Sequence, residues 1–470
     1  MFTSGLGSVD IAVLILYIAA IISIGFIVSR RVKTVKDFTS AGQSLSPLVM
    51  IASCLATFFG AFAGSGAMEM IGQFGLTTLT ILLGANVGWF VMALMAGKMR
   101  KSGALTYPAY IRRLFGAKAQ AASSMISVVY LMGQIAGQFV ACGTMAHLLG
   151  LCSFQTGIVA GGIIMILLSV SGGLSSVTIT DSIQQIFITI MCVIVVPILA
   201  FSNAGGLKAV AAATDPVKMS LFQGAPSGYV IGTFLSLVLA YSCEPSFAQR
   251  IFAAKDEKSV VKETMFACLL GFLFTVPMWG AALTMPILFP EESSLVFLPL
   301  VMKAFLPPVL RGLGIAAFIS LLLTTGNALL VSETSVISND ILPRIWPDAD
   351  ERQGLLISRG VVVVLGGLAV ILGLYFQSVC AVMLLFVGMY GASIFPPVLL
   401  SVVFPKRELR SETVALCMGI TAVLTLTLDL IPAFPAEGIF IGVPVHLILL
   451  LGLSKAESWR IEPAGEEVQV

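Results

Sequence analysis

Six carboxyl side chains of this 470-residue chain lie within or beside apolar stretches, where an ionised group is costly. One of them, Asp181, belongs to the segment GGLSSVTITDSIQQ (residues 172–185), in which Thr178 and Ser182 stand close to it. Such a carboxylate needs a partner, a water-filled cavity or a place at an interface. It could stabilise a helix start through the helix dipole, or it could hold a cation. The six are Glu69, Asp181, Glu244, Glu333, Asp340 and Asp429.

A second polar group lies in the segment SLLLTTGNALLVSETSVISND (residues 320–340), where Thr324 and Thr325 are adjacent hydroxyls followed by Asn327. Threonine hydroxyls in membrane helices often bond back to the carbonyl of the preceding turn. Alternatively, paired hydroxyls supply neutral oxygen ligands for a small alkali cation, completed by the freed carbonyls of a broken helix. Later in the segment, we expect Glu333 to make a structural contact and Asp340 to lie at the membrane interface.

The composition explains why these polar groups stand out. Hydrophobic residues make up 58% and charged residues 11% of the chain, and its mean hydropathy is +1.02. These values predict a polytopic, all-α membrane protein without a soluble domain. A net charge of +2 without a basic stripe argues against a nucleic-acid partner. The chain has no HExxH, no GxSxG and no His–Cys cluster, so we expect neither an enzyme nor an organic cofactor.

Long apolar runs recur along the chain and predict thirteen membrane spans. An odd number puts the termini on opposite sides of the membrane. The loops predicted on one side hold every basic residue except Lys208, Lys218, Lys303 and Arg311, so the positive-inside bias places the N-terminus outside and the C-terminus in the cytoplasm. The spans are 8–29, 45–66, 74–97, 119–148, 153–171, 177–201, 228–248, 263–288, 309–338, 356–376, 379–404, 412–431 and 437–454.

Two of these spans carry helix interruptions. The second contains TFFGAFAGSG (residues 57–66), with three glycines, and the seventh contains AYSCEPSFAQR (residues 240–250), with Pro245. Each begins a block of five spans, and the second block enters the membrane from the opposite side, so the halves would be inverted repeats. Paired interruptions in such halves indicate a transporter's midplane site. The alternative is that the glycines only allow helices to pack closely.

Three stretches together resemble the signature stretches of the solute:sodium symporter family. They are GGLSSVTITDSIQQ, QRIFAAKDEKSV (residues 249–260) and TTGNALLVSETSVISNDIL (residues 324–342), in that order. The resemblance covers nearly the whole chain and implies a LeuT-type core of five plus five inverted helices in a single transmembrane domain. Its parts would be an extra first helix (8–44), repeat 1 (45–201), repeat 2 (228–404), two C-terminal helices (412–454) and a cytoplasmic tail (455–470).

The same resemblance implies a sodium site. Its backbone carbonyls would come from Ala56, Phe59 and Leu321, and its hydroxyls from Thr324 and Thr325. Asp181 is similar to family residues that hold a second sodium or line the sodium exit path. Members that bind the second ion carry hydroxyls after the threonine pair, where this chain has Asn327 and Ala328. We therefore expect one sodium per cycle and assign Asp181 and Asn327 to sodium coupling or release.

The solute is less specified by the sequence. The stretch ATFFGAFAGSGAMEM (residues 56–70) is similar to the choline-transporter branch, which favours a cationic or zwitterionic amine, although most of that branch's tryptophan cage is absent. Carboxylates could neutralise such a solute and aromatic rings could stack on its ammonium group. The predicted substrate-binding residues are Phe58, Phe62, Glu69, Tyr241, Glu244 and Tyr390. The alternative is proton-coupled symport of an amino acid or small carboxylate, with Asp181 or Glu244 carrying the proton.

The predicted protein is thus a sodium-coupled symporter that imports a small organic solute by alternating access. Its partners would be the solute, Na⁺ and the lipid bilayer, and the sequence is compatible with a monomer. We expect it in the plasma membrane, the inner membrane of a bacterium.

Overall fold

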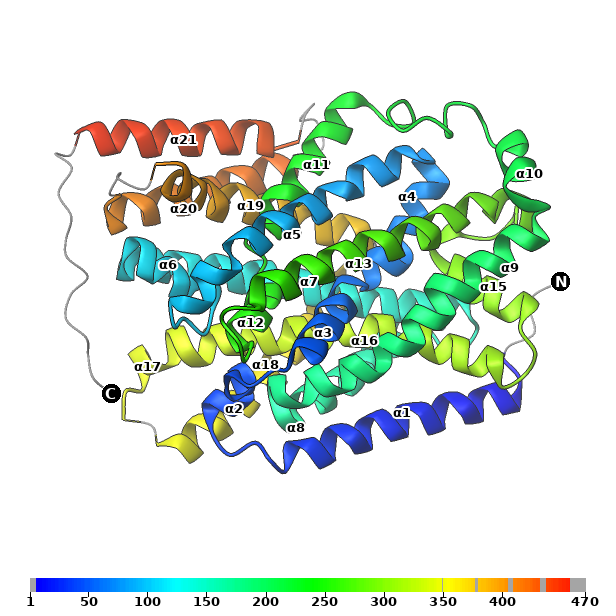
Figure 1. The fold of residues 1–470 in the computed structure, drawn as a ribbon, viewed down its shortest axis with the longest axis horizontal. Coiled ribbons are helices and arrows are strands. Elements are labelled where there is room, and N and C mark those ends of the chain that lie inside the picture. Colours follow the sequence, from blue (N-terminus) through cyan, green and yellow to red (C-terminus); the bar gives the residue numbers. More distant parts are fainter. Residues whose placement is uncertain (1–5, 349, 377–378, 405–408, 432–436, 457–470) are drawn as a thin grey trace.

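A computed structural model describes residues 6–348, 350–376, 379–404, 409–431 and 437–456. These residues form a bundle of long helices that run roughly along the horizontal axis of Figure 1. Within this described part, the sole strand-like pairing is a parallel bridge between Leu45 and Ala254. Ten described helices are long and apolar enough to cross a membrane, or eleven when one bent pair is counted as a single span. The predicted all-α membrane class is confirmed.

The first half of the chain alternates long helices with short connecting ones. Its helices, with π-helical and 3₁₀ turns marked η, are α1 (Ser8–Ser29), α2 (Val35–Ser40), η1 (Ala41–Gln43), α3 (Pro47–Phe58), η2 (Phe62–Gly66), α4 (Ala67–Phe74), α5 (Thr77–Lys101), α6 (Tyr107–Phe115), α7 (Ala117–Leu148), α8 (Phe154–Ile188), η3 (Thr189–Val195), α9 (Val196–Asn203) and α10 (Gly206–Ala213).

The second half follows the same plan. Its helices are α11 (Ser227–Tyr241), α12 (Pro245–Ala253), α13 (Val260–Gly280), η4 (Ala281–Thr284), α14 (Met285–Leu288), η5 (Ser294–Val296), α15 (Phe297–Phe305), α16 (Leu310–Val336), η6 (Ile337–Ile341), α17 (Leu342–Ile345), α18 (Glu351–Tyr375), α19 (Val379–Val403), α20 (Ser411–Asp429) and α21 (Ile439–Ala456).

The exact count of thirteen spans stays a prediction, for two reasons. The predicted spans 153–171 and 177–201 fall within one continuous helical run, Phe154–Asn203, and the last described apolar helix, Ile439–Leu453, is short. The continuous run nevertheless has a sharp break at Gly173, whose φ of 52° and ψ of −143° are not helical. A Cβ atom at this position would overlap the carbonyl oxygen of Phe38, so only glycine fits where α2 packs against the break.

The first predicted interruption is present between α3 and α4. Helix α3 ends at Phe58, Phe59 has φ −84° and ψ 69°, and the axis bends by 52° before the chain continues through η2. The amide of Ala61, freed by the break, donates to Oε1 of Gln138 on α7 (2.9 Å). Glycines permit the close approach of α16 here, since a Cβ on Gly60 would lie 2.6 Å from Oγ1 of Thr325.

The second predicted interruption separates α11 from α12. Helix α11 ends at Tyr241, and α12 begins at Pro245, which suits the first helical position because proline has no amide hydrogen to leave unpaired. Glu244 caps α12, with its Oε2 accepting from the amide of Phe247 (2.8 Å). Both predicted helix breaks are therefore present, one in each half of the chain.

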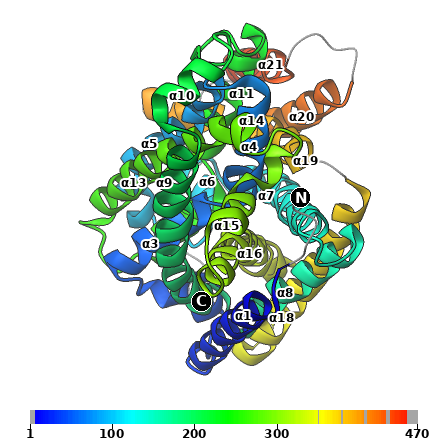
Figure 2. The same cartoon turned by 90° about the vertical axis from the view of Figure 1, so that its right-hand side faces the viewer.

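Helix α16 is the most enclosed of the long helices. In its most apolar window 94% of the residues are buried, against 17% in α1, whose surface is left for lipid. The end-on view of Figure 2 shows α1 and α18 at one edge of the bundle, α20 and α21 at the opposite edge, and α7 and α16 between them. The polar residues of α7 and α16 are therefore positioned in the interior.

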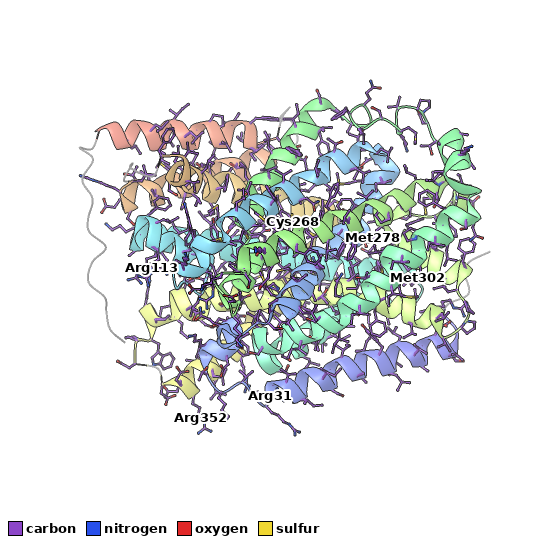
Figure 3. All side chains as sticks on the ribbon, in the orientation of Figure 1. Arg31, Arg113, Cys268, Met278, Met302 and Arg352 are labelled. Carbon is purple, nitrogen blue, oxygen red and sulfur yellow. The ribbon has the colours of Figure 1, made fainter. Side chains whose placement is uncertain are left out.

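The two ends of the bundle differ in charge. Figure 3 places Arg113 and Arg352 at its left-hand end, which we call the basic end. Helix α1 begins at the opposite end and α21 runs toward the basic end (Figure 1). This arrangement agrees with an odd number of crossings, while the assignment of the basic end to the cytoplasm stays a prediction.

Candidate functional site

Two threonine hydroxyls of α16 meet the broken end of α3. Oγ1 of Thr324 donates to the carbonyl of Ala56 (2.9 Å), and Oγ1 of Thr325 lies 3.2 Å from the same oxygen and 3.0 Å from the carbonyl of Thr57. All of these residues are buried. The structure thus brings together predicted sodium residues that are about 270 positions apart in the sequence.

The two remaining predicted sodium residues lie on the same two segments, Phe59 at the end of α3 and Leu321 on α16. Phe59 is the residue at which α3 stops being helical, so its carbonyl is released from the helical ladder. The carbonyl of Leu321 lies 3.4 Å from Oγ1 of Thr324, and the Leu321 side chain packs against Gly64. We call these five residues (Ala56, Phe59, Leu321, Thr324 and Thr325) the oxygen cluster. Carbonyl and hydroxyl oxygens of this kind suit a hard monovalent cation.

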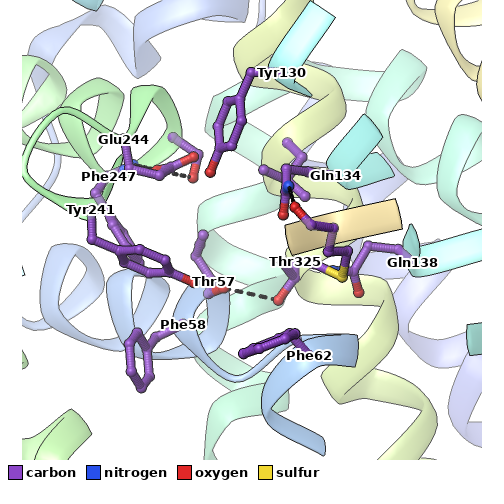
Figure 4. A pocket seen from close by; sticks show the side chains of 14 residues that line it. Thr57, Phe58, Phe62, Tyr130, Gln134, Gln138, Tyr241, Glu244, Phe247 and Thr325 are labelled. Atoms are coloured by element: carbon purple, nitrogen blue, oxygen red, sulfur yellow. Dashed lines mark hydrogen bonds between the residues drawn. The ribbon is translucent and has the colours of Figure 1, made fainter. Parts of the chain in front are cut away.

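A small cavity, with a volume of about 30 Å³, adjoins the oxygen cluster. Thr57 and Thr325 line it, together with four predicted substrate residues: Phe58, Phe62, Tyr241 and Glu244. Figure 4 shows Tyr241 and Glu244 on one side of the cavity and residues of α7 on the other. The remaining lining residues are Gly60, Tyr130, Gln134, Gln138, Ser246, Phe247, Leu329 and Met383.

The other two predicted substrate residues lie outside this lining. The ring of Tyr390 stacks behind Tyr130 at 4.3 Å between centroids, and its hydroxyl donates to the carbonyl of Cys243 (2.8 Å). Tyr390 therefore supports the cavity wall through Tyr130. Glu69 lies on α4, beyond the break and away from the lining residues.

The aromatic residues beside the cavity are largely stacked on one another. Trp89 and Phe247 are nearly parallel, with 4.7 Å between centroids and 6° between planes, and Phe58 stacks on Trp89 at 5.2 Å. These contacts fix the walls of the cavity. Most of their ring surface packs against other rings. A solute could contact only the ring faces and edges that line the cavity.

Two polar side chains of the lining have one atom free within the described part of the chain. Glu244 uses Oε2 to accept from the Ser246 hydroxyl (2.6 Å) and the Phe247 amide, whereas its Oε1 is buried without a hydrogen-bond partner. Gln138 uses Oε1 to accept from Ala61, whereas its Nε2 is buried without a partner. The cavity wall therefore offers one unused carboxyl oxygen of Glu244 and one unused amide donor of Gln138.

Asp181 pairs with a cationic side chain, Arg250, which the sequence analysis placed in a loop. Nη2 of Arg250 lies 3.3 Å from Oδ2 of Asp181, and both side chains are fully buried. We expected Arg250 in a loop on the basic side, and this expectation is wrong. The predicted span stopped at residue 248 because the next residues are polar, whereas α12 continues to Ala253 and carries Arg250 inside the bundle. Asp181 also lies well inside α8, eight residues after Gly173, so a helix-start role is excluded.

A chain of hydrogen bonds joins Asp181 to the oxygen cluster along one face of α3. The Ser53 hydroxyl donates to Asp181 (3.0 Å), the Thr57 hydroxyl donates to the carbonyl of Ser53 (2.8 Å), and Thr325 donates to the carbonyl of Thr57. Asn327 lies to one side, with Oδ1 accepting from Ser169 (3.3 Å). This continuous polar contact gives Asp181 a physical connection to the cluster.

Helix α12 is tied to the segment that precedes α3. Gln249 donates to the carbonyl of Thr39 (2.6 Å), Gln43 donates to the carbonyl of Phe252 (3.2 Å), and the Lys255 amide donates to the carbonyl of Leu45 (3.0 Å). Together with the Asp181–Arg250 pair, these bonds hold α12 against α2, η1 and α8.

Comparison with known proteins identifies the family. The model of the sodium:solute symporter family matches residues 38–419, a stretch that includes both broken helices, the oxygen cluster and Asp181. The chain belongs to the sodium:solute symporter family.

Relatives of this symporter agree with that assignment. It is 22% identical over 433 residues to the osmoregulated proline transporter OpuE of Bacillus subtilis, a match that covers 87% of each chain. It is 25% identical over 467 residues to the sodium/proline symporter of Salmonella typhimurium, covering 93% of this chain and 92% of the relative. A solved structure of a Na⁺-coupled sialic acid symporter in a substrate-bound outward-open state shares its fold, with TM-score 0.83, 17% identity and coverage of 96% of this chain and 98% of that one.

These findings confirm several predictions. The symporter has the LeuT-type fold, is a transporter and not an enzyme, and couples solute movement to sodium as a multi-pass protein of the plasma membrane. The division into repeats and the roles of individual site residues remain predictions.

Three polar residues of the site were missed at the sequence level. Gln138 supports the first helix break, while Arg250 and Ser53 hold Asp181. A signal for Gln138 was present, because glutamines at 134 and 138 share one face of a predicted span. Arg250 belongs to the signature stretch at residues 249–260, but the sequence does not show that α12 carries it into the bundle.

Two acids of α16 and η6 are buried in the protein. Thr106 (2.7 Å) and Gln120 (2.9 Å) donate to the two oxygens of Asp340, and its expected place at the membrane interface stays a prediction. Glu333 was expected to make a structural contact, yet neither of its oxygens has a hydrogen-bond partner in the described part of the chain.

Proposed function

We propose that this symporter imports a small zwitterionic amine, an amino acid or a similar compound, together with one sodium ion. The observation that carries the proposal is the pair of unused atoms on the cavity wall, Oε1 of Glu244 and Nε2 of Gln138. The first can accept from an ammonium group and the second can donate to a carboxylate. In the view of Figure 4 they lie on opposite sides of the cavity.

A zwitterion suits this arrangement better than a purely cationic amine. A cation would use Glu244 and leave the amide of Gln138 buried without a partner, which costs about 1–3 kcal/mol. A simple carboxylate would leave the Glu244 oxygen unpaired and close to its own negative charge. The relatives named as proline transporters support the same class of solute, since proline is a zwitterion.

The oxygen cluster gives sodium a position beside the solute. Sodium there would bind the carbonyls of Ala56 and Phe59 and the hydroxyl oxygens of Thr324 and Thr325, which would turn their protons away from the carbonyls. Bound sodium would hold α3 against α16 and favour the state that is closed at the basic end and open outside. With the basic end in the cytoplasm, a membrane potential adds about 2.3 kcal/mol per charge per 100 mV to inward movement.

Asp181 and Asn327 are proposed to act in sodium release. Asp181 is connected to the cluster through Ser53 and Thr57, on the side of the basic end. Its charge is already matched by Arg250, so it is better suited to guide an ion that leaves than to hold a second one. In this proposal the N-terminus is outside, the C-terminus is cytoplasmic, and one chain suffices for transport.

The solute class is tested by thermal unfolding of the purified symporter with L-proline, choline and propionate, each in sodium and in potassium. A ligand that binds the folded state raises its stability. We expect stabilisation by the zwitterion in sodium alone. Stabilisation by choline but not by L-proline or other amino acids would contradict the zwitterion proposal.

The role of Glu244 is tested with Glu244→Gln, which keeps the shape and the capping acceptor but removes the charge. We expect the affinity for the stabilising amine to fall at least about tenfold, or 1.4 kcal/mol, since a charged hydrogen bond is lost. Glu263→Gln is the matched control, because Glu263 is buried on α13 and bonded to Ser259, outside the cavity lining. Equal effects of the two variants would refute the assignment.

Sodium coupling is separated from proton coupling in proteoliposomes with imposed gradients. Uptake of the stabilising amine should follow a sodium gradient at equal pH on both sides. Uptake driven by a proton gradient in the absence of sodium would favour the alternative of proton-coupled symport.

A further inference from the structure

Glu333 is a carboxyl side chain of α16 that is fully buried and has no hydrogen bond to either oxygen within the described part of the chain. The other buried acids of the interior differ from it. Asp181 is paired with Arg250, Glu244 caps α12, and Asp340 accepts from two side chains. An ionised, unpartnered carboxylate at such a position would cost several kcal/mol.

The position of Glu333 along α16 lies between the cavity and the basic end. Leu329, one turn earlier and on the same helix face, lines the cavity. Asp340, seven residues later, contacts Gln120 of α7 near the start of that helix. The two helices run antiparallel, because α7 residues 130 and 134 line the cavity beside Leu329 while residue 120 meets residue 340. Along the bundle axis, Glu333 is therefore level with the middle of the α7 segment 120–134.

Helix α7 presents a buried polar row along the same stretch. Its members recur every three, four or seven residues and share one helix face. The hydroxyl of Ser124, near the height of Glu333, is buried without a hydrogen-bond partner in the described residues. The row consists of Gln120, Ser124, Ser127, Gln134 and Gln138. It extends from the cavity to the residue that holds Asp340.

No hydrogen bond joins Glu333 to a charged group of the helices packed against α16 in the described part of the chain. Asp10 of α1 pairs with Arg311 at the opposite end, and Arg359 of α18 donates through Nη2 to the carbonyl of Ser171, while its Nε is buried without a partner among the described residues. On the cavity side, Tyr130 stacks on Tyr390. The remaining charged groups, histidines and tyrosines of these helices are Tyr17, bonded to Ser320, Asp181 with Arg250, Asp340 with Gln120, Asp37, which caps α2, Lys118 with Glu412, Lys303 of α15, and the exposed residues Lys36, His147, Glu351, Arg352 and Tyr375.

We propose that Glu333 is a proton-binding site, which holds a proton while the basic end is closed and exchanges it with that side when α7 and α16 separate there. A metal cation would need several oxygen ligands, whereas the neighbouring residues of α16 on this side (Leu329, Leu330 and Val336) are apolar, and neither oxygen of Glu333 has a polar partner within hydrogen-bond distance in the described residues. A proton needs only the carboxyl group itself. When water enters the polar row of α7, the ionised form becomes solvated and the proton can leave.

This site adds a pH-dependent step to sodium symport without replacing sodium as the driving ion. Sodium favours the state that is closed at the basic end, so sodium binding should be accompanied by proton uptake at Glu333. The two equilibria are linked, so protons and sodium should each strengthen the binding of the other.

The protonation state is tested by infrared spectroscopy of the purified full-length symporter at neutral pH. The difference spectrum between the natural protein and Glu333→Gln should show the loss of one carbonyl band of a protonated carboxylic acid. Loss of an ionised carboxylate band in its place would overturn the proposal. Glu333→Met is a second variant of similar size, which keeps the comparison valid when the glutamine variant folds poorly.

The exchange step is tested by adding NaCl or KCl to weakly buffered protein and following a pH indicator. We expect sodium, and not potassium, to cause uptake of up to about one proton per molecule, by linkage. The uptake should be absent in Glu333→Gln and retained in Glu263→Gln. No uptake by the natural protein, or an equal uptake by Glu333→Gln, would refute proton exchange at this residue.

Discussion

Asp181 and Arg250 form an ion pair in the interior of the symporter, with 3.3 Å between Oδ2 and Nη2 and no exposed surface on either side chain. Ser53 joins them, because it donates to Asp181 and accepts from Nε of Arg250 (2.9 Å). Residues of α8, α12 and α3 therefore meet at one point. The second broken helix is held to the first by charge as well as by packing.

Removal of either partner should be costly, because it leaves a buried charge without compensation. We expect Arg250→Met and Asp181→Asn each to lower the free energy of unfolding by about 3–5 kcal/mol. The double variant should lose less than the sum, since no charge is then left unpaired. Chemical denaturation in detergent measures all three.

The exposed pair of Lys118 and Glu412 is the control for this cycle. Its single variants Lys118→Met and Glu412→Gln should change stability by roughly 0–1 kcal/mol. If Arg250→Met lowered the free energy of unfolding no more than Lys118→Met, the buried Asp181–Arg250 pair would not stabilise the fold as proposed.

Thr325→Ala should weaken sodium binding. The change removes a hydroxyl that contacts the carbonyls of Ala56 and Thr57, and with it one oxygen ligand of the oxygen cluster. We expect at least a tenfold higher sodium concentration for half-saturation, about 1.4 kcal/mol, whereas Thr325→Ser should keep most of the affinity. Sodium titration of tryptophan fluorescence, with Trp89 and Trp279 near the broken helices, supplies the measurement.

Thr334→Ala is the matched control for this prediction. Thr334 is a buried threonine on the same helix, and its hydroxyl donates to the carbonyl of Leu330 in its own helix (2.8 Å). Its removal should leave sodium affinity within about twofold, less than 0.5 kcal/mol. Equal sodium affinities of Thr325→Ala and Thr334→Ala would argue against sodium in the oxygen cluster.

Gly60→Ala should impair the same cluster from the opposite side. The added Cβ would lie 2.6 Å from Oγ1 of Thr325, so α3 and α16 could not keep their present distance. Overpacking of this kind costs about 1–3 kcal/mol. Sodium affinity should fall with stability, and the thermal shift caused by sodium reports both.

Gly367→Ala controls for the loss of a helical glycine. This position on α18 has no atom within 4 Å of an added Cβ, so alanine should be neutral or stabilising by up to about 1 kcal/mol. Combining Gly60→Ala with Thr325→Ser should restore part of the stability by removing a methyl group from the clash. A Gly60→Ala protein with unchanged sodium affinity would contradict the close contact.

The sequence allowed the membrane class and the helix breaks to be predicted, because both depend on local signals. Apolar runs give spans, and Pro245 and the glycines around Gly60 interrupt helices whatever surrounds them. Thr324 and Thr325 stood out as adjacent hydroxyls in an apolar helix, whereas Ala56, Phe59 and Leu321 came from the family resemblance. The structure places both hydroxyls against the carbonyl of Ala56.

The partners of buried charges were not predictable in the same way. Arg250 and Asp181 are 69 positions apart, and their meeting depends on how α12 enters the bundle. The same applies to the free amide of Gln138 and to the isolation of Glu333, since both follow from the packing of α7 against helices distant in the sequence. Hydropathy marks such residues as unusual but does not show what they touch.

Gly173→Ala should be among the most damaging single changes in the chain. Gly173 adopts φ 52° and ψ −143°, a conformation that residues with a Cβ rarely tolerate, and its Cβ would overlap the carbonyl of Phe38. Backbone strain and the clash should together lower stability by about 3 kcal/mol or more, because the carbonyl cannot move without shifting α2.

The control is Gly150→Ala. Gly150 has φ 70° and open space around it, so this change should lower stability by only about 1–2 kcal/mol. The yield of monodisperse protein and its free energy of unfolding compare the two variants, and similar losses would mean that the reversal at Gly173 tolerates a side chain.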